Sequence, residues 1–247
     1  AAAGGGGATA AELKAELLEL CGEGEAGRGR VEAARRVEEI VSALEQGYGG
    51  PRAGCLREAR EAMEGRWRLL CTFVPGAAAA DVSSLDSWRE YVFGRGPSPV
   101  QAAALSGDAA RRVYQAIELG GSAGRWHNVV DALPFAVFCI QADVSLEEAA
   151  GGAGGPALRF QWTGGRITIC RLPWSSEDLE EPWRLPYPVP FAALGDRARG
   201  TFDTMYLDGD LRIARGSKSG SVFVLVREGG RLPLESEYYP ELTSKPA

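Results

Sequence analysis

Residues 206–216, YLDGDLRIARG, combine strand-forming side chains with charged groups that could do chemistry. Asp208, Asp210, Arg212 and Arg215 place four charges among apolar neighbours. Such a set could be a catalytic cluster, a salt-bridged edge of a sheet, or the closing strands of a small barrel. These three interpretations imply different functions, so the other candidate groups and the surrounding elements are needed to choose between them.

Other candidates for catalysis or metal binding are sparse. His127 is the only histidine, which excludes a histidine pair on a metal and leaves a single residue for any histidine-activated nucleophile. We interpret it as an ordinary strand residue. The five cysteines are widely spaced without a C-x-x-C pair, which argues against a zinc site or a disulfide framework and favours a reducing compartment. We therefore predict no catalytic residue and no metal site.

Two further patterns involve charge. The adjacent pairs 147–148 and 180–181 are both Glu-Glu, but neighbours on a strand point to opposite faces, which disfavours a two-carboxylate mechanism. Arg212, Arg215 and Lys218 could hold a diphosphate head group, because charged donors form strong hydrogen bonds to phosphate oxygens. Surface ion pairs are the competing interpretation of the same charges.

Composition excludes several classes of protein. The chain has 247 residues, 45% hydrophobic and 24% charged, which is enough for a core in one or two domains. A net charge of −6 and the lack of a long Lys/Arg run argue against a nucleic-acid partner. The longest apolar run, ALPFAVFCI, is far shorter than the roughly 20 residues that a membrane-spanning helix needs.

The first quarter of the chain has helical periodicity. Apolar residues recur at helical spacing in 11–21 and 30–46, and a short third helix is expected before Gly65. We interpret 1–10 as a flexible leader, 11–63 as an N-terminal helical segment and 232–247 as a C-terminal tail.

From Gly65 the apolar period changes to two, as in a strand with one buried face. The alternating apolar positions are Trp67, Leu69 and Phe73 in the first strand, and Leu158, Phe160 and Trp162 in a later one. Eight or nine such segments follow one another in hairpin-like order. The pattern predicts a mainly β chain with an antiparallel up-and-down barrel over residues 64–231.

Several blocks in this order resemble one known family. GRWRLL, VYQAI with NVVD, the proline-rich LPYPVPF, and YLDGDLRIARG followed by GSVFVLVRE are similar to the plastid lipid-associated protein, or fibrillin, family over about residues 11–228. The resemblance implies a lipocalin-like barrel with an N-terminal helical segment. It provides no catalytic residue to carry over, which agrees with a protein that is not an enzyme.

The resemblance implies a noncatalytic chloroplast protein that binds or sequesters a lipophilic molecule such as an isoprenoid, carotenoid, quinone or lipid. It would lie peripherally on thylakoids or plastoglobules, with a transit peptide removed before residue 1. An alternative is a structural or assembly subunit of a thylakoid photosynthetic complex. A third class, an enzyme of lipid or isoprenoid metabolism, is disfavoured by the single histidine and the missing motifs.

Ligand contacts are expected on the inward faces of the strands, at Trp67, Leu69, Phe73, Leu158, Phe160, Trp162, Ile213 and Phe223. Lipocalin-like barrels join a Trp of the first strand to an Arg near the last, and Trp67 matches the first partner. Arg212 and Arg215 are both candidates for the second, because Arg215 shares a face with Leu211 and Ile213 whereas Arg212 lies opposite. A hollow barrel would favour ligand binding, and a filled one a scaffold role.

Overall fold

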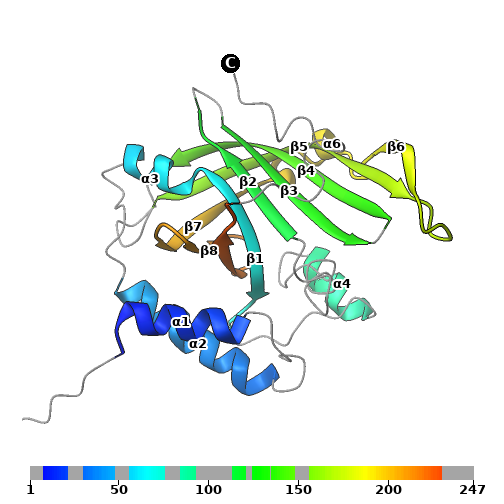
Figure 1. Cartoon of the computed structure of the whole chain (residues 1–247). Helices are drawn as coiled ribbons and strands as arrows, with labels where there is room; N and C mark the ends of the chain where they lie inside the picture. Colours follow the sequence, from blue (N-terminus) through cyan, green and yellow to red (C-terminus); the bar gives the residue numbers. More distant parts are fainter. Residues whose placement is uncertain are drawn as a thin grey trace, which may run out of the picture.

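The computed structural model describes residues 8–21, 30–47, 56–75, 84–92, 113–120, 124–133, 135–147 and 156–229. Most of the leader expected at 1–10 and all of the tail expected at 232–247 lie outside these residues. The described chain is mainly β, with helices at its N-terminal side (Figure 1). The predicted fold class is confirmed.

The strands form one antiparallel sheet that closes on itself. They are β1 (Gly65–Phe73), β2 (Val113–Glu118), β3 (Gly124–Leu133), β4 (Ala136–Glu147), β5 (Ala157–Arg171), β6 (Asp178–Pro186), β7 (Arg199–Leu207), β8 (Leu211–Gly216) and β9 (Val222–Arg227). Their order in the sheet is β4-β3-β2-β1-β9-β8-β7-β5-β6, and β4 also pairs with β5. Every strand except β6 therefore belongs to a closed, barrel-like ring.

Strand β5 is shared between the ring and a projecting hairpin. One edge of β5 pairs with β4 along almost its whole length. The other edge pairs with β7 over 157–161 and with β6 over 166–171. Because β5 leaves β7 after Gln161, the β5–β6 hairpin extends away from the ring (Figure 1).

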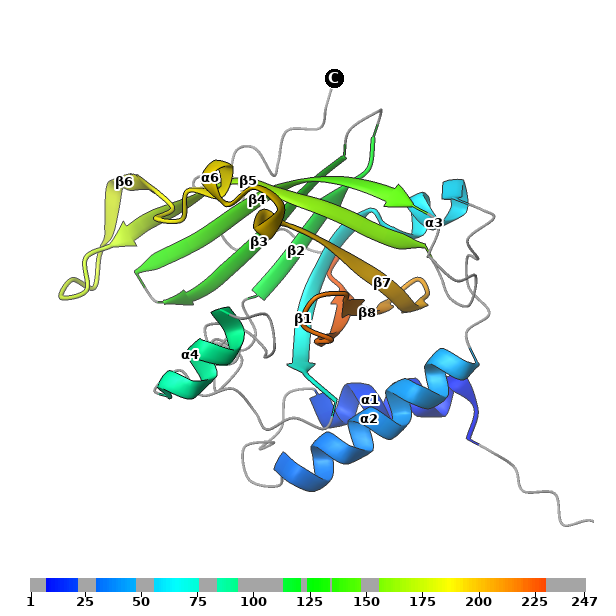
Figure 2. The ribbon, with the colours of Figure 1, turned by 180° about the vertical axis from the view of Figure 1, so that it is seen from behind.

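Two helices cover one outer face of the ring. Helices α1 (Ala10–Cys21) and α2 (Arg30–Gln46) lie side by side against the part of the ring that contains β1 and β7 to β9 (Figures 1 and 2). We call their shared apolar contact the outer cluster; its buried members are Leu17, Val37, Ile40, Val41, Leu44, Met205, Leu211, Ile213, Val222 and Val224. Burying each large aliphatic side chain stabilises the fold by about 1.5–3 kcal/mol. Packing on the sheet therefore determines where these helices lie.

The remaining described helices are short: α3 (Leu56–Met63), α4 (Leu85–Val92), α6 (Phe191–Leu194) and the 3-10 turn η2 (Gly195–Ala198). Helix α3 leads directly into β1 at one end of the ring (Figure 1). None of the described helices is long and apolar enough to cross a membrane.

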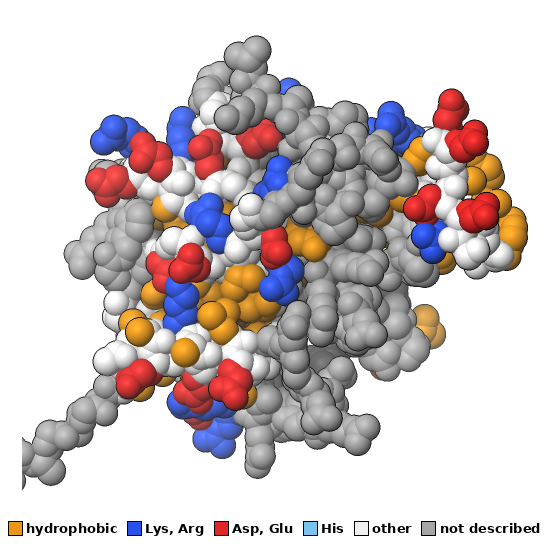
Figure 3. Space-filling view, in the orientation of Figure 1, with side chains coloured by type: hydrophobic (Ala, Val, Ile, Leu, Met, Phe, Trp, Pro, Cys, Tyr) orange, Lys and Arg blue, Asp and Glu red, His pale blue; other side chains and the backbone are white. Residues whose placement is uncertain are grey.

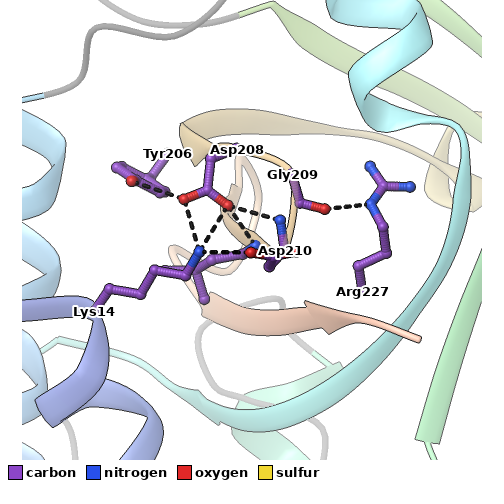
Figure 4. Close-up of polar contacts among 7 residues, drawn as sticks. Lys14, Tyr206, Asp208, Gly209, Asp210 and Arg227 are labelled. Atoms are coloured by element: carbon purple, nitrogen blue, oxygen red, sulfur yellow. Dashed lines mark hydrogen bonds and ion pairs between the residues drawn. The ribbon is translucent and has the colours of Figure 1, made fainter. Parts of the chain in front are cut away.

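The carboxylate of Asp208 organises the turn between β7 and β8 and binds it to α1 (Figure 4). It accepts hydrogen bonds from the backbone N–H groups of Asp210 and Leu211 at 2.8 and 2.7 Å, and from the Tyr206 hydroxyl at 3.0 Å. The ammonium of Lys14 lies 3.0 Å from Asp208 and 3.2 Å from Asp210. Both carboxylates of YLDGDLRIARG thus serve to hold a turn and dock a helix.

These contacts shift pKa values in opposite directions. Partial burial would raise the pKa of Asp208, but the hydrogen bonds from Asp210, Leu211, Lys14 and Tyr206 lower it below its usual value. Burial would lower the pKa of Lys14, but its hydrogen bonds to Asp208 and Asp210 raise it. Burial and the bond to Asp208 raise the pKa of Tyr206 to about 12. The charged pair is therefore favoured in the folded protein.

Replacing Lys14 by Met should lower the free energy of unfolding by about 1 kcal/mol at pH 7, because the ion pair is partly buried. The stability from the lowered pKa of Asp208 is present above the unfolded pKa, about 3.9, and is lost as pH falls through the folded pKa. Urea denaturation followed by circular dichroism should therefore show the difference between wild type and Lys14→Met shrinking as pH falls below the unfolded pKa of Asp208.

The matched control is Arg35→Met, since the Arg35 side chain is 84% exposed beside Glu39 and should change stability less. A Lys14→Met deficit that stays constant from pH 7 to pH 3 would assign the effect to the lost apolar stem rather than to the ion pair.

Candidate functional site

The inside of the ring is filled by an apolar group of side chains that we call the inner cluster. Its buried members are Met63, Trp67, Leu69, Val113, Ile117, Leu119, Trp126, Val130, Ala142, Val144, Leu158, Phe202, Leu207, Ala214, Phe223 and Leu225. Phe160 and Trp162 are half-buried against it. The structure therefore places six of the eight expected lining residues here: Trp67, Leu69, Leu158, Phe160, Trp162 and Phe223.

Aromatic rings form a continuous series within this cluster. Phe223 lies 5.1 Å from Phe202, which stacks on Phe160 at 5.2 Å, all between ring centroids. Phe160 lies 5.2 Å from Trp162, and Trp126 contacts Phe202, Phe160 and Trp162 at 5.2, 5.2 and 4.9 Å. Offset and edge-on pairs at these separations are favourable arrangements for aromatic side chains.

The series continues outward at the point where β5 separates from β7. Phe191 of α6 lies 6.2 Å from Trp162 and stacks on Tyr187 at 6.0 Å. Both outer rings are half-buried. We call the seven residues Phe223, Phe202, Phe160, Trp126, Trp162, Phe191 and Tyr187 the aromatic ladder. It connects the buried interior with a partly exposed surface.

Phe73 lies in the outer cluster, so the expectation that it faces inward is wrong. The register between β1 and β9 shifts between Leu69 and Cys71, which inserts Leu70 as an extra residue. An inserted residue reverses the faces of all positions after it. Leu69 therefore faces the inner cluster, whereas Cys71 and Phe73 face α1 and α2.

Ile213 is also corrected, because it lies with Leu211 in the outer cluster. Arg215 is on that same outer face, where its guanidinium lies 3.6 Å from Glu45 of α2. Side chains of β8 alternate between the two faces of the sheet as expected. However, the face with Leu211, Ile213 and Arg215, which we expected to point inward, points outward. The reason is that α1 and α2 bury the outer face of β8 as completely as the ring buries its inner face.

Trp67 has its cationic partner at the end of the last strand. The Arg227 guanidinium carbon lies 4.2 Å from the centre of the Trp67 ring, and the two residues are direct partners on β1 and β9. Such a contact contributes about 0.5–2 kcal/mol, depending on desolvation. Trp67 donates its indole N–H to the carbonyl of Met63 at 2.8 Å. Neither Arg212 nor Arg215 takes the closing role that we expected for one of them.

Arg227 also bonds to three backbone carbonyls, in two other segments of the chain. It donates to the carbonyl of Gly209 in the β7–β8 turn at 2.6 Å (Figure 4), to that of Glu64 at 2.7 Å, and to that of Ala62 in α3. Gly65 lies so close that a β-carbon there would be 2.7 Å from the guanidinium, and its φ of 122° also favours glycine. This environment lowers the pKa of Arg227 through burial.

The sequence did contain a signal for Arg227. In VFVLVRE, Phe223, Leu225 and Arg227 share one face of the strand, and Phe223 was expected to point inward. Because alternate residues of a strand share a face, an inward Phe223 implies that Arg227 also points inward. The other missed aromatics, Trp126 and Phe202, lie in segments whose inward faces were not assigned from the sequence.

Arg212 points into the ring and is 1% exposed. Its Nη1 donates to the side-chain oxygen of Gln115 on β2 at 2.9 Å. Burial lowers the pKa of Arg212 to about 10. Lys218, by contrast, donates to the Asp196 carbonyl at 3.0 Å in an exposed position. The suggested diphosphate group of Arg212, Arg215 and Lys218 is therefore not brought together.

His127 is buried on the outer face of β3, and burial together with the nearby Arg125 and Arg166 charges lowers its pKa to about 4. Within the described ranges, no three or more His, Cys, Asp or Glu residues are arranged to hold a metal ion.

A cleft of about 230 Å³ lies where β6 meets the outside of β4 and β5, lined by Cys139, Gln141, Gly165, Arg166, Arg184, Leu185 and Pro186.

Arg227→Gln and Trp67→Phe should each destabilise the protein by about 1–3 kcal/mol, because each leaves buried polar or aromatic partners without their contact. Combined in a double-mutant cycle, the two losses should be coupled by about 0.5–2 kcal/mol. Urea denaturation of the four proteins measures this coupling. Arg215→Gln, on the outer face, serves as the control, and its loss of stability should not couple to that of Trp67→Phe. If the losses of stability in Arg227→Gln and Trp67→Phe are simply additive, Arg227 does not have the closing role.

Comparison with known proteins gives a family for this architecture. The PAP_fibrillin family matches residues 11–226. "Probable plastid-lipid-associated protein 12, chloroplastic" from Arabidopsis thaliana is 30% identical over 209 residues, which is 82% of this chain and 41% of that protein. "Plastid lipid-associated protein 1, chloroplastic" from Brassica campestris is 56% identical over 45 residues, 18% of this chain and 14% of that protein.

The chain thus spans less than half the length of these curated relatives. No solved structure matches it. Because the family match covers most of the sequence, including every strand of the ring up to Val226, this chain belongs to the plastid lipid-associated protein, or fibrillin, family.

Proposed function

We propose that this chain is a noncatalytic protein of plastids that binds or sequesters a lipophilic molecule. The observation that carries the proposal is the aromatic ladder, which extends from the buried Phe202 and Phe223 to the half-buried Phe191 and Tyr187. Aromatic faces offer large apolar contact areas for conjugated or isoprenoid chains. The family and the chloroplastic relatives support a plastid setting.

The proposed contact residues are the members of the inner cluster along the ladder, with Trp67, Leu69 and Leu158 behind them. Because side chains fill the interior, a ligand enters only if the outer rings move. Trp162, Phe191 and Tyr187 are half-buried, so they have room to do so. An isoprenoid, a carotenoid, a quinone or another lipid would satisfy these apolar walls equally well.

We further propose that the β5–β6 hairpin contacts the surface of thylakoids or plastoglobules. It exposes Trp174, Trp183 and Leu185 by 81%, 54% and 45%. Figure 3 shows hydrophobic side chains on this projection at the right, next to acidic and basic ones. Tryptophan favours the boundary between lipid and water. The hairpin carries nearly balanced charge, with carboxylates at 177, 178, 180 and 181 and arginines at 166, 171 and 184, which favours a neutral lipid surface over a strongly charged one.

Two observations support the second candidate function, a structural or assembly subunit of a photosynthetic membrane complex. The interior of the ring is filled by its own side chains, as expected for a scaffold, and the same hairpin exposes tryptophans. Exposed tryptophans are as suitable for the centre of a protein interface as for a lipid surface. The two candidates differ in whether the hairpin binds protein-free lipid.

Phe160→Ala should weaken binding of decyl-plastoquinone or β-carotene about fivefold to tenfold, because it removes a ring from the middle of the ladder. Quenching of intrinsic tryptophan fluorescence by the added quinone or carotenoid measures the affinity. Phe73→Ala is the matched control, since Phe73 is also a half-buried phenylalanine but faces the outer cluster. Equal losses in both variants would show that the ligand does not bind along the ladder.

Replacing both Trp174 and Trp183 by Ser should reduce binding to vesicles of neutral galactolipid about tenfold or more, since it removes exposed apolar area from the proposed contact. Flotation of protein with vesicles measures the bound fraction. Leu85→Ser on α4 is the control, because Leu85 is 86% exposed outside the hairpin. Unchanged flotation of the double variant would rule out the lipid contact and favour the assembly role.

A further inference from the structure

Arg212 is a buried cation that closing the ring does not require. It is 1% exposed, and its hydrogen bond to the neutral Gln115 at 2.9 Å joins β8 to β2 across the interior. Its Nε has no hydrogen-bond partner within the described part of the chain. Burying a charge is costly unless it is both paired and hydrogen-bonded. One neutral partner therefore leaves this guanidinium only partly satisfied.

Nothing among the described residues supplies the missing charge. Burial is the cause of the lowered pKa of Arg212, with no carboxylate acting against it. Two other arginines differ in this respect: Arg215 on the same strand pairs with Glu45, and Arg227 on β9 lies near the charges of Asp210 and Asp208. The interior of the ring thus holds one positive charge without a described counterion.

Other buried polar groups lie on the inward faces of neighbouring strands. Gln115 lies directly opposite Asn128 on β3. Thr204 on β7 lies opposite Ala214, and Ala214 is two positions after Arg212 on the same face of β8. Asn128 and Thr204 are 6% and 3% exposed, and each has a side-chain oxygen with no partner among the described residues. We call Gln115, Asn128, Thr204 and Arg212 the polar belt. Buried polar atoms in native proteins normally have a protein, water or ligand partner.

The polar belt adjoins the deep end of the aromatic ladder. Ala214 is opposite Thr204 on one side and Phe223 on the other, and Phe223 is the first ring of the ladder. From there the rings lead outward to Trp162 and Phe191. A molecule that follows the ladder inward therefore meets Arg212 at its end, with apolar walls behind it.

We propose that Arg212 binds the carboxylate of an amphipathic lipid whose hydrocarbon chain lies along the aromatic ladder. This inference rests on the proposed lipophilic binding function and specifies the class of ligand. A guanidinium and a carboxylate match in geometry and form two parallel hydrogen bonds. Nε is one of the donors suited to such a pair.

The belt favours a carboxylate over a diphosphate for a reason of charge. A diphosphate head group calls for several cations, but Arg215 and Lys218 are not in the belt and have partners elsewhere. A single guanidinium balances a single carboxylate. The amides of Gln115 and Asn128 and the hydroxyl of Thr204 are further hydrogen-bond donors on the inward faces of β2, β3 and β7.

The test compares cis-parinaric acid, a fluorescent fatty acid, with its methyl ester, which has the same chain without the charge. The wild-type protein should bind the acid about tenfold or more tightly than the ester, measured by fluorescence titration at pH 8. Arg212→Gln should lower the affinity for the acid to that for the ester and leave the ester affinity unchanged. Arg215→Gln is the matched control and should retain the preference for the acid.

The outcomes separate this inference from the proposed function. Equal affinity of the wild type for acid and ester overturns the carboxylate site and leaves lipophilic binding intact. Failure of both probes to bind overturns both proposals. If Arg212→Gln does not fold, as judged by circular dichroism, the wild-type comparison still decides, together with Arg212→Lys, which keeps the charge and should keep part of the preference. Loss of the preference in Arg215→Gln also overturns the site.

Discussion

The contact between Arg227 and Trp67 is the point on which the rest of this structure depends. A sheet can enclose an apolar interior only if its first and last strands meet, and here they meet at this pair. The same guanidinium bonds to carbonyls in α3 and in the β7–β8 turn. Strand pairing, the helix at one end and a hairpin are thereby joined through one side chain, and the interior aromatics remain shielded from water.

The ring is buried to different extents around its circumference. On β8 and β9 both faces are buried, because the inner cluster lies on one side and α1 with α2 on the other. At β5 and β6 the sheet instead leaves the ring and exposes its tryptophans. The helix-covered side is suited to stability, whereas the hairpin side is suited to contact with other molecules. Aromatic rings reach the surface on that second side, through Trp162 and Phe191.

Much of this arrangement could be predicted from sequence wherever one face of an element is polar. Trp67 and Leu69 alternate with arginines, and Phe160 and Trp162 flank a glutamine, so the inward face was evident. The prediction failed at Ile213 because both faces of β8 are buried, and the pattern then cannot show which one is inside. It failed at Phe73 because an inserted residue in β1 reverses the faces of the positions after it, and such an insertion cannot be recognised from the residue types. The contact of Lys14 with Asp208 joins residues 194 apart, beyond the reach of local patterns.

The position of the closing arginine also determines the order in which the protein can assemble. Arg227 and Glu64, which it bonds, are 163 residues apart in the chain. During synthesis the first strand therefore leaves the ribosome long before its final neighbour exists, and β1 has an unpaired edge in the meantime. Folding dominated by such distant pairings is slow, and the open edge is vulnerable to association with other chains. Helices α1 and α2, which are synthesised before β1, are available to cover its outer face, but the edge of β1 that pairs with β9 stays open until β9 is made.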